Sequence, residues 1–297
     1  MTTRVQKWKK RLFRWTCILV LFFFLLPLLS LAMPESMKPA KTKTFFADKK
    51  VAFRDTTLTV KGRPMRFVCT GNDTMPLLLF IHGSPGSWDA FKDYLADSSL
   101  RARAFMVSPD RAGYGGSGKE GVATLSEQVE LISAVLTLRK NQKPITIVGH
   151  SYGGPVAVRF AIDYPAVVKQ LILISPVISP SIEENIGWKR RLQKMSQWWG
   201  WRWAISNDLK NSTREMQPLP DELRKMEPYY VNFRIPVTEL HGTKDPLAPY
   251  GNQEYVKDML AGTSVETITY ENESHFFVWS KTADIIQLIG KKLDAAN

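Results

Sequence analysis

Short runs of consecutive apolar residues alternate along the chain with segments whose apolar residues recur at helical spacing. Such runs, with the length and composition of strands, occupy residues 77–81, 145–148, 171–174 and 236–240, and residues 265–268 are a further expected strand. Between them, residues 125–138 and 155–164 show the spacing of amphipathic helices. This alternation predicts strand–helix–strand units and therefore an α/β protein with a mainly parallel central sheet and helices on both faces.

Other segments depart from this alternation of strands and helices. Residues 57–69, with turn residues at 61–64, predict an antiparallel hairpin ahead of the parallel strands. The rhythm breaks again over residues 177–232, which separates a first core segment, 50–176, from a second, 233–297. These two segments are long enough to bury one large core together, and residues 34–49 are expected to be a linker.

The N-terminus has a different character. Six basic residues precede an uncharged apolar run from Thr16 to Met33, which is about long enough to span a membrane. Positive charge ahead of the run predicts a membrane anchor within residues 1–33, with the N-terminus in the cytoplasm and the catalytic domain extracytoplasmic. Small residues near Ala32 leave a cleaved signal peptide, and a secreted or periplasmic protein, as the alternative.

Charge and cysteine content exclude several classes of function. The formal net charge is +12, and the six basic residues of the tail supply half of it, so nucleic-acid binding is not expected. Cys17 lies in the apolar run and Cys69 stands alone in the folded part, so no internal disulfide is expected there. No metal-ligand spacing and no phosphate-binding glycine loop is present, and neither a metal nor a cofactor is expected.

Ser151 is the candidate nucleophile. It lies in the sequence Gly149-His150-Ser151-Tyr152-Gly153, between the run at 145–148 and the helical segment from Pro155. A G-x-S-x-G sequence between a strand and a helix is typical of a sharp turn that exposes a serine hydroxyl above a parallel sheet. Glycines flank the serine because neighbouring backbone leaves no room for a side chain there.

A serine hydroxyl needs a base and an orienting acid. Of the four histidines, His82, His150 and His241 are interpreted as turn residues, which leaves His275, after the last predicted strand, as the base. Asp245 follows the preceding strand and is the predicted acid, ahead of the weaker rivals Glu239, Asp258 and Glu271. The chain order Ser151, Asp245, His275 matches one hydrolase family and neither common order of the serine proteases.

Main-chain N–H groups that donate to the oxyanion formed during serine attack are expected at two places. The first is the segment His82-Gly83-Ser84-Pro85-Gly86 just past the buried run at 77–81, and the second is the residue after the nucleophile. Because proline has no N–H, the main-chain amide of Ser84 is the predicted donor in the first segment, and that of Tyr152 in the second.

These motifs together resemble the α/β-hydrolase fold superfamily, in particular its cap-bearing branch of esterases, epoxide hydrolases, dehalogenases and carbon–carbon hydrolases. The resemblance covers roughly residues 50–297 and includes the loop Asp110–Ser117, to which it assigns a structural role. Epoxide hydrolases and haloalkane dehalogenases carry an aspartate at the nucleophile position, whereas this chain has Ser151, which favours acyl transfer to water. The resemblance also implies that residues 177–232 form a helical cap over the active site.

The expected cap is rich in tryptophan and basic residues. Alongside five tryptophans (Trp188, Trp198, Trp199, Trp201, Trp203), it holds Lys189, Arg190, Arg191, Lys194 and Arg202. Such a composition fits ordinary packing on the core, a roof over an acyl chain, or a face against lipid headgroups.

The sequence therefore predicts a serine hydrolase that cleaves ester-type bonds of a small-molecule acyl substrate, or of a lipid-derived one, through an acyl-enzyme. The same triad would also serve a carbon–carbon bond hydrolase, a cofactor-free haloperoxidase or a proline iminopeptidase, and these alternatives stay open. A catalytically silent scaffold is disfavoured because every triad member is present.

Overall fold

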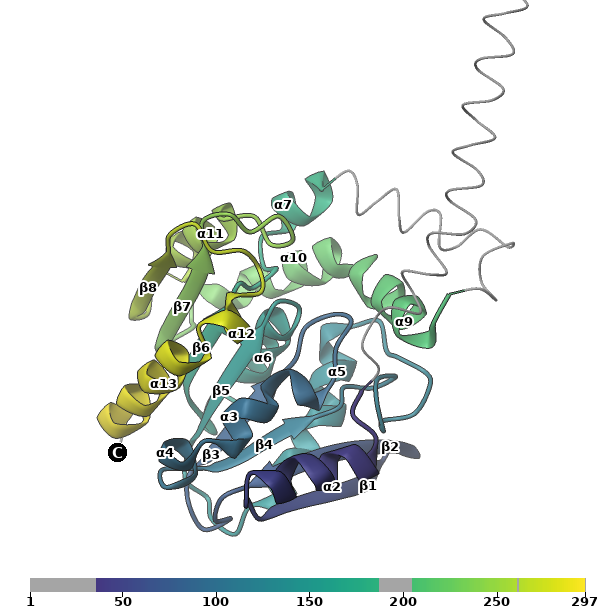
Figure 1. Ribbon diagram of the computed structural model, residues 1–297. Coiled ribbons are helices and arrows are strands. Elements are labelled where there is room, and N and C mark those ends of the chain that lie inside the picture. Colours follow the sequence, from purple (N-terminus) through teal and green to yellow (C-terminus); the bar gives the residue numbers. More distant parts are fainter. Residues whose placement is uncertain (1–35, 187–204, 261, 297) are drawn as a thin grey trace, which may run out of the picture.

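The computed structural model describes residues 36–186, 205–260 and 262–296, which form one eight-stranded sheet with helices on both faces (Figure 1). The strands run in the order β1-β2-β4-β3-β5-β6-β7-β8, and all neighbours from β4 onward pair in parallel. The prediction of a mainly parallel α/β sheet is confirmed. The strands are β1 Phe53–Val60, β2 Arg63–Thr70, β3 Leu77–Ile81, β4 Phe105–Pro109, β5 Ile145–His150, β6 Val168–Ile174, β7 Val237–Gly242 and β8 Val265–Tyr270.

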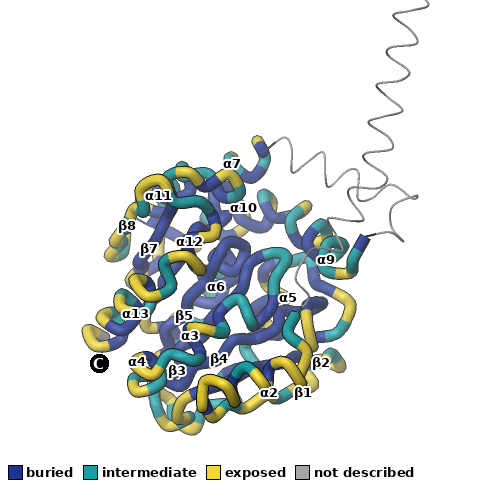
Figure 2. Tube along the Cα trace, viewed as in Figure 1, coloured by how far each residue is buried: buried dark blue, intermediate teal, exposed yellow. Residues whose placement is uncertain are grey.

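The central strands are buried on both sides because alternate residues enter two separate cores. Along β3, Leu77, Leu79 and Ile81 join one core, while Leu78 and Phe80 join the other. Helices on one face complete the first core, and helices on the other face complete the second. Figure 2 shows this as continuous dark blue through the middle of the sheet, with exposed residues concentrated on the outer helices and on β8.

The helices follow the strands in the order that the sequence pattern indicates. Residues 125–138 are divided between an α-helix and a 3₁₀ turn, and the helix begins at Thr124, whose hydroxyl accepts the Glu127 amide at 3.2 Å. The helical elements are α2 Pro39–Asp48, η1 Trp88–Phe91, α3 Lys92–Ala96, α4 Ser98–Arg101, α5 Leu125–Ile132, η2 Ser133–Leu138, α6 Gly153–Asp163, α7 Pro180–Asn185, α9 Asn207–Met216, α10 Leu219–Tyr230, α11 Gly251–Met259, α12 Phe277–Ser280 and α13 Thr282–Ala296.

The predicted hairpin is present but longer than the sequence indicates. Strands β1 and β2 pair antiparallel from Phe53↔Thr70 to Val60↔Arg63, with Lys61 and Gly62 alone forming the turn. Both turn residues have positive φ, 49° and 74°, which suits the right-handed twist of a two-residue hairpin.

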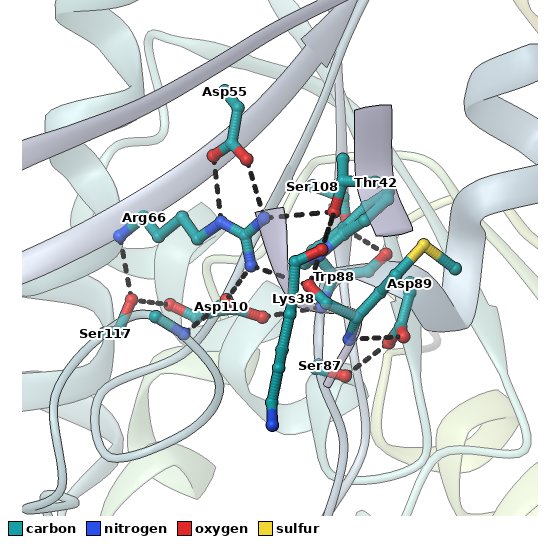
Figure 3. Close-up of polar contacts among 12 residues, drawn as sticks. Lys38, Thr42, Asp55, Arg66, Ser87, Trp88, Asp89, Ser108, Asp110 and Ser117 are labelled. Atoms are coloured by element: carbon teal, nitrogen blue, oxygen red, sulfur yellow. Dashed lines mark hydrogen bonds and ion pairs between the residues drawn. The ribbon is translucent and has the colours of Figure 1, made fainter. Parts of the chain in front are cut away.

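Most of the segment expected to be a linker, residues 34–49, is instead a docked helix, α2 (Pro39–Asp48), and this is a correction. Phe46 is fully buried and stacks on Phe53 and Trp88. The buried guanidinium of Arg66 fixes the start of the helix, since it donates to the Met37 carbonyl at 3.1 Å and to Thr42 Oγ1 at 3.2 Å (Figure 3). This docking could not be predicted because Phe46 stands in a short segment without clear periodicity.

Two expected features concern residues at the N-terminus and in the cap. The apolar run Thr16–Met33 lies outside the described residues, and among the helices that are described none is long and apolar enough to cross a membrane.

Between β6 and β7 the described part of the chain contains α7, α9 and α10, which lie together on one side of the molecule (Figure 1). The tryptophans and basic residues predicted to line the cap also lie outside the described residues.

Candidate active site

Ser151 stands at a strained turn between β5 and α6. Its φ is 55°, a left-handed value that is uncommon for a residue with a side chain. Hydrogen bonds hold the turn in place. The Ser151 amide donates to the Ile174 carbonyl, and the Ser151 carbonyl accepts from the Gly154 amide, each at 2.9 Å. A side chain on Gly149 would strike the backbone of Gly153, so the glycine on that side of the serine is required by packing. The structure thus has the strand–turn–helix geometry that the motif indicated.

Asp245 and His275 form a buried pair. The His275 Nδ1–H donates to Asp245 Oδ2 at 2.7 Å, and the other carboxylate oxygen accepts the amides of Leu247 and Ala248 at 2.8 Å each. Burial raises the pKa of Asp245, but its hydrogen bond and charge interaction with His275 and the Ala248 amide outweigh burial and lower that pKa overall. The carboxylate is therefore ionised at neutral pH and directs the second ring nitrogen of His275 away from itself.

His150 connects this pair to the nucleophile turn. Its ring lies 4.8 Å from the His275 ring, and its Nε2–H donates to the His275 carbonyl at 3.3 Å. Burial, followed by the nearby His275, lowers the pKa of His150 to about 3, so the ring is neutral at physiological pH. The residue before Ser151 therefore anchors the loop that carries His275. The sequence suggested only a turn residue here, and no local signal indicates a contact 125 positions away.

The rival acids are engaged elsewhere. Glu239 binds His241 Nδ1 at 2.7 Å, and Glu271 accepts the Thr243 hydroxyl at 3.3 Å. Asp258 is exposed on α11. Of the four acids weighed, Asp245 is the one hydrogen-bonded to His275 within the described residues.

The loop after β3 passes directly against Ser151, the candidate nucleophile. A side chain on Gly83 would lie 2.9 Å from Ser151 Cβ and 3.4 Å from Ser151 Oγ, which shows how closely this backbone approaches. Within the described part of the chain, neither the Ser84 amide nor the Tyr152 amide donates to another backbone group. Tyr152 also immediately precedes α6, where backbone N–H groups and the helix dipole favour negative charge.

No metal centre accompanies these residues: the described segments contain no group of three His, Cys, Asp or Glu side chains that could hold a metal ion. A serine on a strand–turn–helix bend, a buried Asp–His pair on the loops after β7 and β8, and this strand order are features of the α/β-hydrolase fold.

Comparison with known proteins leads to the same class. A family model described as the alpha/beta hydrolase fold matches residues 76–212. Protein ABHD8 of Mus musculus is 27% identical over 219 residues, and this match covers 65% of this chain and 49% of that protein. An uncharacterized protein of Mycobacterium tuberculosis is 24% identical over 299 residues, which cover 80% of each chain. The chain thus spans about half the length of the ABHD8 relative.

Solved structures show the same fold at low sequence identity. A bacterial membrane phospholipase A, described as a virulence factor, has a TM-score of 0.65 at 17% identity, over 98% of this chain and 99% of the other. A putative lipase from Acinetobacter baumannii has a TM-score of 0.66 at 20% identity, over 89% and 98% of the two chains. The family model and these structures together support the α/β-hydrolase fold for this chain.

Proposed function

We propose that the protein is a serine hydrolase that cleaves acyl esters through a covalent acyl-enzyme on Ser151. The observation that carries the proposal is the buried 2.7 Å hydrogen bond between His275 and Asp245, on a loop that His150 ties to the nucleophile turn. In the proposed arrangement the oriented imidazole of His275 activates the Ser151 hydroxyl.

The proposed reaction has two halves. The Ser151 oxygen attacks the ester carbonyl while His275 Nε2 takes its proton, and the resulting oxyanion accepts hydrogen bonds from the Ser84 and Tyr152 amides. The C–O bond then breaks, and the alcohol leaves with the proton from His275. In the second half, water gives a proton to His275 while its oxygen attacks the acyl carbon. The bond between the acyl carbon and the Ser151 oxygen then breaks, His275 returns the proton to that oxygen, and the carboxylic acid leaves. Asp245 stabilises the imidazolium in both halves.

The choice of an ester substrate is supported by the serine nucleophile and by the kinds of protein that share the fold. Structural neighbours include the putative lipase, a thermophilic esterase from Thermogutta terrifontis and a thioesterase domain from the curacin pathway. A lipase, an esterase and a thioesterase each break an acyl–oxygen or acyl–sulfur bond, which is the chemistry proposed for Ser151.

The test compares Ser151→Ala with Ser133→Ala, a surface serine whose hydroxyl donates to the Glu130 carbonyl. The wild type and Ser133→Ala should react with a fluorophosphonate probe and hydrolyse p-nitrophenyl esters, whereas Ser151→Ala should do neither. Labelling of Ser151→Ala would refute the assignment. Cleavage of proline amides or ring-fission dienones in preference to esters would refute the proposed substrate class while leaving the nucleophile in place.

We also propose that residues 16–33 anchor the protein in a membrane with the catalytic domain outside the cytoplasm. The support is the charge pattern alone, with basic residues before the run and none inside it. The full-length protein should stay in the membrane fraction after alkaline extraction. A mature N-terminus at Met33 would contradict the anchor and indicate cleavage after Ala32.

A further inference from the structure

One buried guanidinium contacts both segments that carry the proposed oxyanion amides. Arg111, in the loop after β4, is fully buried, and its Nε donates to the His82 carbonyl at 3.1 Å. Its Nη2 donates to the Gly83 carbonyl at 2.8 Å, and the guanidinium carbon lies 4.7 Å from the centre of the Tyr152 ring. A single side chain therefore touches the loop after β3 and the residue after the nucleophile.

The contact with the Gly83 carbonyl bears directly on the Ser84 amide. The Gly83 C=O and the Ser84 N–H belong to one planar trans peptide, so they point in opposite directions and turn together. The Gly83 carbonyl accepts from Arg111 Nη2 and from His82 Nδ1, each at 2.8 Å. These two donors fix the rotation of the peptide plane, and with it the direction of the Ser84 N–H.

Arg111 is in turn held by the cap. The carboxylate of Glu215, on α9, accepts hydrogen bonds from Arg111 Nη1 at 2.6 Å and from Arg111 Nη2 at 2.8 Å. Both side chains of this bidentate ion pair are buried. The same carboxylate also accepts from the Tyr114 hydroxyl at 2.7 Å and from Gln128 Nε2 at 2.9 Å. Four donors thus fix Glu215, so the position of this cap helix determines where the guanidinium lies.

A stability role alone does not account for this arrangement. Buried ion pairs contribute little net stability compared with well-packed apolar side chains of the same volume, whereas they specify geometry strongly. The planar guanidinium offers donors in fixed directions, and Arg111 uses them on two consecutive carbonyls of one loop and on one carboxylate of the cap.

We propose that Arg111 is a positioning residue for the oxyanion hole and that Glu215 makes this positioning depend on the docked cap. The proposal rests on the serine hydrolase assignment made above. It predicts that loss of the pair slows the chemical step while the affinity for substrate is retained, because the Ser84 amide meets charge that develops only in the transition state.

The test measures kcat and KM on a p-nitrophenyl ester for full-length Arg111→Lys, Glu215→Gln and the double variant Arg111→Met/Glu215→Leu. The double variant replaces the ion pair with apolar side chains, so it separates folding from catalysis. Each folded variant should lose at least about tenfold in kcat, a fraction of the loss seen when an oxyanion donor is deleted, with KM within about threefold of wild type. Affinity for a trifluoromethyl ketone, whose adduct carries an oxyanion, should fall in parallel with kcat.

Thr213→Ala is the matched control on the same helix. The Thr213 hydroxyl donates to the Leu209 carbonyl within α9 at 3.0 Å. This variant should retain near wild-type kcat. Wild-type kcat in the folded double variant, or an equal loss in Thr213→Ala, would overturn the proposal. If Ser151→Ala is inactive, either of these results overturns the role of Arg111 and leaves the proposed serine hydrolase function intact. If Ser151→Ala is active, the proposed function and the role of Arg111 are both refuted.

Discussion

Replacing Gly153 with alanine should force apart the two backbone segments that meet at the nucleophile. An added Cβ would lie 2.8 Å from the Ile81 carbonyl carbon and 2.9 Å from the His82 oxygen, and it would come closer still to the Ile81 oxygen. All three atoms are backbone, so no side-chain rotation relieves the overlap. Gly153 begins α6 just after Tyr152, and Ile81 ends β3 just before the loop of Ser84.

The magnitude follows from two opposing effects. Glycine to alanine in a helix ordinarily stabilises by about 1 kcal/mol. Overpacking in a rigid core costs roughly 1–3 kcal/mol and more where the surrounding atoms cannot move. Because the clash here is with backbone of a buried strand, we expect a net loss of about 2 kcal/mol, which corresponds to roughly 4–8 °C in Tm for a domain of this size. A shift of about 1 Å at the site can cost roughly a hundredfold in rate.

The assay pairs thermal unfolding with the rate of fluorophosphonate labelling. Gly290→Ala is the control, since Gly290 lies within α13 and an added Cβ meets no atom within 4 Å. It should raise Tm slightly and leave labelling unchanged. Equal Tm values for Gly153→Ala and wild type, or labelling at the wild-type rate, would refute the claim that this close approach sets the geometry of the turn.

Three further predictions concern charge and substrate. Asp245→Asn keeps an acceptor for the Leu247 and Ala248 amides but loses the negative charge opposite His275, so kcat should fall by about 10³–10⁴ with the fold intact by circular dichroism. Burial raises the pKa of Asp110 to about 6 in spite of the Gly116 and Trp88 amides and Arg66 (Figure 3). A raised folded-state pKa stabilises the fold below the unfolded value near 4 and loses that contribution as pH rises through about 6. The unfolding free energy of wild type relative to Asp110→Asn should therefore fall by on the order of 2–3 kcal/mol from pH 4 to pH 7, and a flat difference in urea titrations would contradict it. If residues 16–33 hold the site near a bilayer, medium and long p-nitrophenyl esters should be hydrolysed faster than the acetate, and a clear preference for acetate would oppose a lipid-derived substrate.

The sequence located the candidate triad because each member follows a strand. The carboxyl ends of parallel strands meet at one edge of a sheet, so Ser151 after β5, Asp245 after β7 and His275 after β8 are brought together by topology once the strand pattern is recognised. The runs that form β3, β5, β6 and β7 are buried as expected, because central parallel strands are apolar on both faces, whereas the run in the edge strand β8 is partly exposed.

Contacts between side chains far apart in the sequence could not be predicted from it. Arg111 and Glu215 are 104 positions apart and His150 and His275 are 125 apart, and no periodicity links either pair. The docking of α2 depends on Arg66 reaching the Met37 carbonyl, again without a local pattern. Such contacts become visible only when the elements are placed in space, since propensity and spacing describe neighbours along the chain.

Several features that oppose stability gather at one edge of the sheet, and this gathering points to the site independently of the motif. Ser151 and Ser175 hold positive φ values of 55° and 44° at the ends of neighbouring strands β5 and β6. His150 is buried with its pKa lowered to about 3, and Arg111 is buried in an ion pair. Each of these features, the strained φ values, the buried histidine and the buried ion pair, lowers the stability of the fold. Such features persist only where the packing around them holds the residues in place. The double-sided core of β3, β5 and β6 meets that condition directly beneath these residues. Strain, buried charge and a neutral buried histidine therefore coincide where rigid positioning of Ser151 is needed, which a purely structural edge of the sheet would not require.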